Sequence, residues 1–192
     1  DAGFASMLRD LDELEIAERT AIILFGDHGE ELFERGRFGH GRGLGDEALR
    51  VPIMIRAPGL EPGVRSHQVM LEDLFPTVLD LAGVGNSSAS IGRGLLSDGS
   101  SGRRTMVFRN SDSWAIRRGE FKLLLGPRAE VSLVEPAKDR QESENLAADR
   151  PVLARYLRSA LSYAIAFDRV WQEARWGSVA NHGPGFPGDQ GL

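Results

Sequence analysis

The sequence predicts an α/β domain followed by a small antiparallel sheet and a C-terminal helix. The α/β part is indicated by two short apolar runs rich in branched side chains, at residues 21–25 and 51–55, with helical patterns before and after them. Each run is too short for an independent helix, so we predict that both are strands of a parallel sheet, buried on both faces. Beyond residue 102 the pattern changes, and short strand-like runs predict an antiparallel sheet.

The predicted helices follow from the spacing of apolar residues. Residues 2–18 carry apolar side chains at mostly helical spacing, with acidic and basic residues between them. A second helix is predicted over residues 73–82, with Asp73 as its N-cap. Pro76 fits the first turn of that helix, because the amide donors there lack helical partners.

The C-terminal half begins after a connection dominated by serine and glycine, at residues 86–102. The strand-like runs that follow lie at residues 105–109, 114–117 and 121–125. A last helix begins near Pro151, and the tail from Gly177 has little apolar surface to bury. We therefore predict two domains and a disordered tail, at residues 1–102, 103–176 and 177–192.

Composition excludes several classes of function. The 192 residues are 41% hydrophobic and 27% charged, which is ordinary for a globular protein, and the net charge of -5 gives no basic surface for nucleic acid. The absence of cysteine excludes disulfides, thiolate metal sites and a cysteine nucleophile within this chain. No apolar run approaches the roughly 20 residues that span a bilayer. Because the chain opens on Asp1 and has no initiating methionine, we expect a fragment.

The loop between the two apolar runs carries the candidate site. Asp27 and His28 follow the first predicted strand and offer a carboxylate and an imidazole, about half of a divalent-metal site. His40 lies between Gly39 and Gly41 and could act as a general acid. By position alone, a polar pair that ends a strand and a solvated loop histidine are the simpler interpretations. The neighbouring charged residues are expected to form a solvated face, and they are Glu30, Glu31, Glu34 and Arg35.

Several segments in order resemble the carboxyl half of a sulfatase. The resemblance spans roughly residues 1–160 and implies an alkaline-phosphatase-like α/β sandwich, here in part, which binds a divalent metal beside a covalent nucleophile. It implies that residues 1–102 are the C-terminal half of the catalytic domain. The segments are Asp27-His28-Gly29-Glu30-Glu31, Arg37-Phe38-Gly39-His40-Gly41, Arg50-Val51-Pro52, Ala57-Pro58-Gly59, residues 73–83 and residues 142–147.

The resemblance also assigns roles to three residues. Asp27 and His28 match metal-ligand positions, and His40 matches the position that contacts the transferred sulfate or protonates the leaving oxygen. The family favours Ca²⁺, although the imidazole of His28 suits manganese or zinc better than an all-oxygen calcium site does. The implied substrate is a sulfate ester or a phosphoester, and the implied nucleophile is a formylglycine.

The chain also departs from the family pattern. It contains neither Cys-x-Pro-x-Arg nor Ser-x-Pro-x-Arg, so no nucleophile is present, and the paired aspartates of the first family strand are missing. Arg35 and Gly45 stand where relatives often have histidine and tyrosine. The prediction is therefore a sulfatase-like protein, with sulfuric ester hydrolysis as the parent activity, that is incomplete as an enzyme. Two alternatives stay open: a phosphodiesterase or phosphonate monoester hydrolase of the same superfamily, and a non-catalytic binding fragment.

Overall fold

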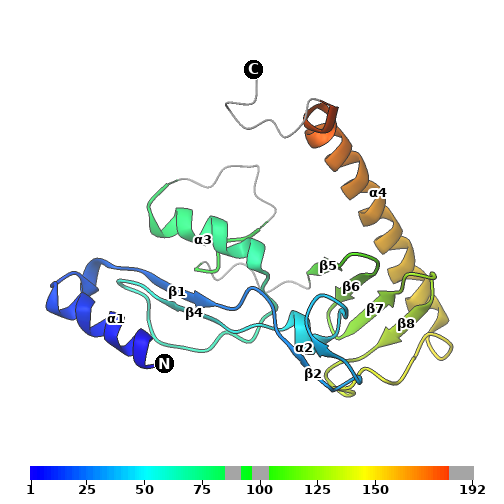
Figure 1. Cartoon of the computed structure of the whole chain (residues 1–192), viewed down its shortest axis with the longest axis horizontal. Helices are drawn as coiled ribbons and strands as arrows, with labels where there is room; N and C mark the ends of the chain where they lie inside the picture. Colours follow the sequence, from blue (N-terminus) through cyan, green and yellow to red (C-terminus); the bar gives the residue numbers. More distant parts are fainter. Residues whose placement is uncertain (85–91, 97–103, 182–192) are drawn as a thin grey trace. The chain divides into compact units, whose positions relative to one another are not determined.

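A computed structural model describes residues 1–84, 92–96 and 104–181 of the chain. It divides into two compact units, each treated by itself below (Figure 1). Unit 1 comprises residues 1–40 and 45–104, and unit 2 comprises residues 41–44 and 105–192. Most of the serine- and glycine-rich connection predicted at residues 86–102 lies outside the described residues.

Unit 1 contains short strands and helices in the order α1, η1, β1, β2, β3, α2, β4, η2 and α3. The predicted first helix is confirmed as α1 followed by one 3₁₀ turn, η1, and the second as α3, with Pro76 in its first turn. The bounds are α1 Ala2–Glu13, η1 Ala17–Arg19, β1 Ile22–Phe25, β2 Glu31–Leu32, β3 Phe38–Gly39, α2 Asp46–Leu49, β4 Ile53–Arg56, η2 Leu71–Asp73 and α3 Leu74–Leu81.

The predicted parallel sheet is wrong in its pairing. β1 and β4 form a two-stranded antiparallel ribbon in which Ile23 lies opposite Ile55. An apolar run of four or five residues indicates a strand but not its direction, and the long loop between the runs lets the chain return beside itself. The ribbon is also not buried on both faces, because Phe25 is 47% and Met54 57% exposed.

A buried carboxylate organises the start of α3. The side chain of Asp73 is fully buried and accepts hydrogen bonds from the backbone N–H of Met70 at 2.9 Å and of Arg93 at 2.8 Å. Its Oδ2 also pairs with Nη1 of Arg104 at 2.5 Å. Asp73 precedes α3 as predicted, but it makes no side-chain cap bond to that helix. It instead ties η2 and two later segments together.

Unit 2 is a four-stranded antiparallel sheet with one long helix. The strands lie in the order β5-β6-β7-β8, so each is hydrogen-bonded to its sequence neighbour. Three of them confirm the predicted runs, whereas β8 was not predicted, although Gly126-Pro127 marks a turn before its four-residue run. The bounds are β5 Thr105–Arg109, β6 Trp114–Arg118, β7 Phe121–Leu125, β8 Val131–Val134 and α4 Pro151–Asn181.

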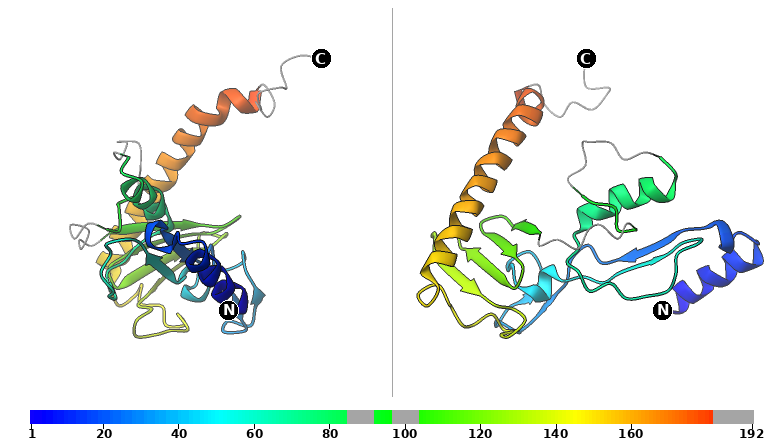
Figure 2. Two further views of the ribbon diagram at one scale, coloured as in Figure 1. Left: turned by 90° about the vertical axis from the view of Figure 1, so that its left-hand side faces the viewer. Right: turned by 180° about the vertical axis from the view of Figure 1, so that it is seen from behind.

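The core of unit 2 lies between this sheet and the first half of α4 (Figure 2). Leu157 and Leu161 of α4 are buried in one cluster with three side chains of the sheet. These are Ile116 of β6, Leu123 of β7 and Leu133 of β8. Residues four apart lie on one face of a helix, which is why this leucine pair reaches the same sheet surface.

The segment at residues 142–147 holds unit 2 together through two polar side chains. Asn145 acts as an extra partner for β8, since its Oδ1 accepts from the N–H of Leu133 and its Nδ2 donates to the carbonyl of Val131, both at 3.0 Å. Glu142 pairs with Lys122 of β7 at 2.5 Å, and both side chains are completely buried. The Lys122 ammonium also donates to the carbonyl oxygen of Leu44 at 3.0 Å, which fixes the segment that follows His40 to the sheet.

The C-terminal boundary differs from the predicted one. α4 continues to Asn181, so residues 177–181 are helical where a disordered tail was expected from Gly177. Once a helix is established, each further residue adds one backbone hydrogen bond, and no proline occurs before Pro184 to stop it. Residues 182–192 lie outside the described part of the chain. Among the described residues, no helix is both long and apolar enough to cross a membrane.

Candidate functional site

The candidate site begins where β1 ends. Asp27 Oδ1 accepts a hydrogen bond from the backbone N–H of His28 at 3.0 Å, while the Asp27 side chain is 83% exposed. The other carboxylate oxygen of Asp27 lies 3.8 Å from Nε2 of His28. Nδ1 of His28 is 2.8 Å from the carbonyl oxygen of Gly29. If Nδ1 carries the proton and donates to that oxygen, Nε2 presents its lone pair on the side of Asp27.

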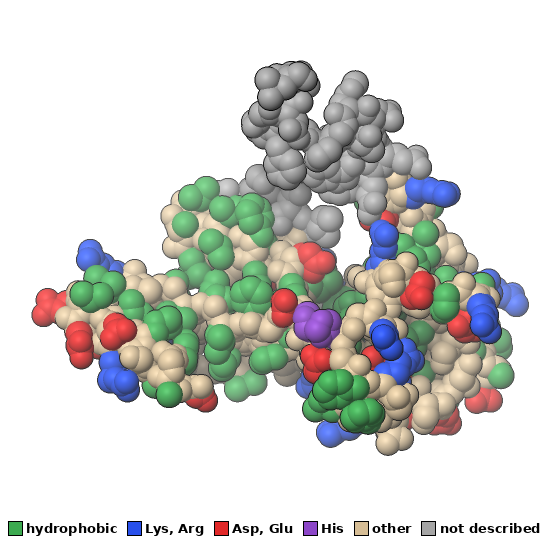
Figure 3. Space-filling view, viewed as in Figure 1, with side chains coloured by type: hydrophobic (Ala, Val, Ile, Leu, Met, Phe, Trp, Pro, Cys, Tyr) green, Lys and Arg blue, Asp and Glu red, His purple; other side chains and the backbone are tan. Residues whose placement is uncertain are grey.

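The β2–β3 hairpin brings His40 to the same place. Its register pairs Glu31 with Gly39, so Glu30 and His40 lie opposite each other one step farther from the turn. The His40 ring lies over the His28 ring, with 4.1 Å between centroids and 34° between planes. Gly39 and Gly41 have φ of 101° and 82°, values that favour glycine and that let the chain turn on either side of His40. Figure 3 shows histidine at the surface with acidic side chains beside it.

The prediction that four charged neighbours form a solvated face is wrong for two of them. Glu30 is exposed as expected, and its Oε2 lies 3.2 Å from Nδ1 of His40. Glu31 is only 1% exposed, because alternate residues of a strand point to opposite sides and Glu30 takes the outer one. Arg35 pairs with Glu47 of α2 at 2.8 Å and is mostly buried. Glu34 is exposed as expected.

The short helix α2 and the residue before it contact the site loop at two points. The N–H of Gly29 donates to the carbonyl oxygen of Ala48 at 2.8 Å, and a Cβ on Gly29 would collide with the carbonyl of Glu47. Arg35 lies against Gly45, where a side chain would collide with the guanidinium. The two positions that depart from the family pattern therefore contact each other, and the arginine fills space that a larger residue at position 45 would need.

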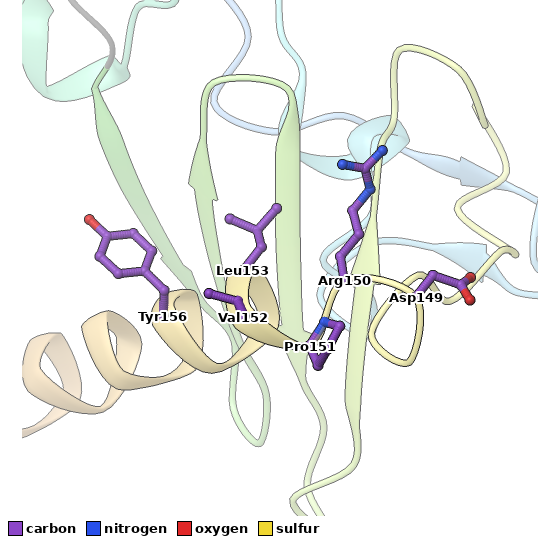
Figure 4. A pocket seen from close by; sticks show the side chains of 6 residues that line it. All are labelled: Asp149, Arg150, Pro151, Val152, Leu153 and Tyr156. Atoms are coloured by element: carbon purple, nitrogen blue, oxygen red, sulfur yellow. The ribbon is translucent and has the colours of Figure 1, made fainter.

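Unit 2 has a surface pocket whose lining residues lie far along the sequence from the candidate site at residues 27–40. It lies at the start of α4, and its labelled side chains project from the first turns of the helix and the residues before it (Figure 4). The lining is mostly apolar, with Arg150 placed over the ring of Phe121 at 5.1 Å. The lining contains none of the three residues predicted from the motifs, Asp27, His28 and His40. The lining residues are Asp149, Arg150, Pro151, Val152, Leu153 and Tyr156.

Comparison with known proteins shows which family the N-terminal part of the chain resembles. Residues 1–84 match the family model "Sulfatase". This part of the chain therefore resembles the sulfatase family. It is 24% identical over 191 residues to arylsulfatase K of Mus musculus, which covers 88% of this chain and 34% of the relative. The chain thus spans about a third of the length of that curated relative.

Solved structures support the same fold. A 2-O GAG sulfatase superposes with a TM-score of 0.73 at 21% identity, covering 97% of this chain and 46% of that one. A phosphonate monoester hydrolase from Silicibacter pomeroyi superposes with a TM-score of 0.69 at 27% identity, covering 87% of this chain and 38% of that one. The chain accordingly has the alkaline-phosphatase-like α/β fold in part, followed by the antiparallel sheet and helix of unit 2.

The donor set of the loop fits a divalent metal. The Asp27 and His28 side chains are 83% and 44% exposed, with Oδ2 of Asp27 3.8 Å from Nε2 of His28. His28, Glu30 and His40 also offer ligand atoms that all lie within 4.8 Å of one another. Glu30 was missed as a candidate because only the hairpin register, which a two-residue strand does not reveal in sequence, places it opposite His40.

Proposed function

We propose that this chain provides the metal-binding and proton-donating part of a sulfuric ester hydrolase site. The observation that carries the proposal is the contact between the His28 and His40 rings, 4.1 Å apart, beside Asp27 in a segment that matches the sulfatase family. An exposed histidine alone would carry little weight. Two histidines whose rings lie together, with a carboxylate next to one of them, form a site that can bind and protonate an ester.

His40 is proposed as the general acid. Oε2 of Glu30 lies 3.2 Å from Nδ1 of the ring and can accept a hydrogen bond from it, which holds the imidazole in orientation. Nε2–H can then give its proton to the oxygen of the departing alcohol. Because the ring is exposed and flanked by two glycines, an ester can approach it from the solvent side.

Asp27 and His28 are proposed as the metal ligands. A divalent ion bound there would polarise the oxygens of the sulfate group. Ca²⁺ is proposed from the family, and Mn²⁺ is the alternative because one of the two donors is an imidazole. The two residues supply only a minority of the six or more donors that such an ion takes, so we expect water to complete the shell in this chain and the affinity to be low.

The attacking group has to come from outside these 192 residues, since the chain holds no family nucleophile segment. We therefore propose that the chain is inactive by itself. A phosphonate monoester hydrolase is the second candidate, supported by the similarity to the enzyme from Silicibacter pomeroyi at 27% identity. A non-catalytic binding protein is the third.

The coding sequence that precedes Asp1, together with an assay of the protein it encodes, tests the proposal. We expect a Cys-x-Pro-x-Arg or Ser-x-Pro-x-Arg segment, turnover of an aryl sulfate, and at least about a hundredfold loss in His40→Ala, the range of a general acid. His67→Ala serves as the matched control. A threonine or an unmodified serine with turnover of a phosphonate ester supports the second candidate. No such segment and no turnover supports the third.

A further inference from the structure

His28, Glu30 and His40 form a set of metal donors that differs from the proposed pair of Asp27 and His28. One ligand atom from each of the three lies within 4.8 Å of the other two, and all three side chains reach solvent. Two imidazoles and one carboxylate are the donors that zinc accepts. Calcium prefers oxygen alone, so this set disfavours it.

The backbone explains why these three side chains converge. The β2–β3 register sets Glu30 opposite His40 on one side of the hairpin. The hydrogen bond from Gly29 N–H to the carbonyl of Ala48 holds the turn that carries His28 toward them. A metal-binding histidine usually donates its second ring nitrogen to a carbonyl, and Nδ1 of His28 already lies 2.8 Å from the Gly29 oxygen.

The spacing of the donors suits a small ion. In a tetrahedral zinc site with bonds of about 2.1 Å, two donor atoms lie about 3.4 Å apart. The Oε2 atom of Glu30 and Nδ1 of His40 are 3.2 Å apart and meet that value without movement. His28 has to close the remaining distance by a small adjustment of its exposed side chain that keeps Nδ1 near the Gly29 oxygen.

We propose that His28, Glu30 and His40 bind Zn²⁺ as a three-ligand site whose fourth position is open to water. Zinc binding at these three residues follows from the donor geometry alone. The effect of zinc on ester hydrolysis rests on the proposed function. Zinc takes the Nδ1 lone pair of His40, so the ring can no longer carry two protons, and Nε2–H of a ring that is not an imidazolium is a much weaker acid toward a leaving alcohol. Zinc is therefore expected to inhibit the ester hydrolase by binding at the acid and not at the Asp27 carboxylate.

Calorimetric titration with zinc chloride tests the site directly, on the metal-stripped chain without an affinity tag. We expect one zinc per chain, and at least about a tenfold loss of affinity in Glu30→Gln and in His40→Ala, since even supporting residues of metal sites cost that much. His67→Ala is the matched control, because it removes a histidine outside the set. Circular dichroism shows whether each variant keeps its fold.

Asp27→Asn separates this inference from the proposed function. We expect this variant to keep its zinc affinity while it loses calcium or manganese binding. Absence of stoichiometric zinc binding in the wild type, or zinc binding that Glu30→Gln leaves unchanged, overturns the inference and leaves the proposed function standing. Zinc affinity that falls as much in Asp27→Asn as in Glu30→Gln also overturns it, because the ion then sits on the Asp27 side.

Discussion

The sheet of unit 2 is covered by a helix, whereas the β1–β4 ribbon of unit 1 has exposed apolar side chains. In unit 2 the strands β6, β7 and β8 are covered by α4, and Leu123, Leu133 and Leu161 are fully buried. In unit 1 large apolar side chains of β1, β4 and α3 stay exposed, and Figure 3 shows hydrophobic side chains gathered over these elements. The C-terminal sheet therefore has a core of its own, whereas the strands that carry the candidate site do not.

The burial of polar side chains differs between the two units in the same way. Unit 2 buries a complete lysine–glutamate pair and uses it to fix residues 41–44. The candidate site in unit 1 is built from exposed residues on a hairpin of two-residue strands, supported by α2. The buried core and the proposed chemistry therefore lie in different units, and substitutions should separate them.

The largest expected effect is the loss of the buried ion pair. Glu142→Gln leaves the Lys122 charge buried without its counter-charge, and removal of one partner of a buried pair costs about 3–5 kcal/mol of unfolding free energy. Asp168→Asn is the matched control, because the Arg109–Asp168 pair at 3.1 Å is exposed and contributes about 0–1 kcal/mol. Urea denaturation followed by circular dichroism measures both. Equal losses in the two variants would contradict the distinction.

A core substitution should distinguish the two units in the same way. Leu161→Ala opens a cavity between α4 and the sheet and should cost about 2–5 kcal/mol. Met54→Ala in β4 removes a side chain that is 57% exposed, and a surface change of this kind stays within about 0.5 kcal/mol. The same denaturation experiment compares them. A larger loss for Met54→Ala would mean that the ribbon of unit 1 is buried in solution.

The support of the site loop is tested by a glycine substitution. In Gly29→Ala the new Cβ collides with the backbone carbonyl of Glu47, and overpacking of this kind costs about 1–3 kcal/mol. It should also move His28 away from His40, which the ring proton shifts of the two histidines report. Gly3→Ala is the control: nothing lies within 4 Å of the added atom in α1, and alanine there is favoured by about 0.5–1 kcal/mol. Unchanged ring shifts in Gly29→Ala would show that α2 does not position the site.

The smallest expected effect is a titration in unit 2. Hydrogen bonds from the backbone N–H of Glu144 at 2.8 Å, and then of Ser143 at 2.7 Å, lower the pKa of Asp139 below its ordinary value of 3.8. The ionised carboxylate is thus the form that the fold favours. Its contribution is present above pH 3.8 and is lost as the pH falls through the lower folded value. An NMR titration of the Asp139 carboxyl measures it, and a value at or above 3.8 would contradict these bonds.

The sequence predicted the elements of unit 2 better than the pairing in unit 1. Helical spacing fixed α3 and the start of α4, and turn residues separated β6 from β7, because these signals are local. The direction of β1 against β4 and the burial of Glu31 depend on contacts between distant residues, which periodicity does not report. Asp27, His28 and His40 were chosen from motifs, and only the register of a very short hairpin placed Glu30 with them.

The most direct measurement is an assay of this chain with an aryl sulfate and excess Ca²⁺ or Mn²⁺, next to the Asp27→Ala variant. We propose metal ligands and a general acid among these residues but no attacking group, and covalent catalysis does not proceed without one. We therefore expect that wild type and Asp27→Ala release the alcohol at the same background rate. Turnover by the wild type that falls to background in Asp27→Ala would contradict this expectation, because the chain would then hold a complete catalytic site.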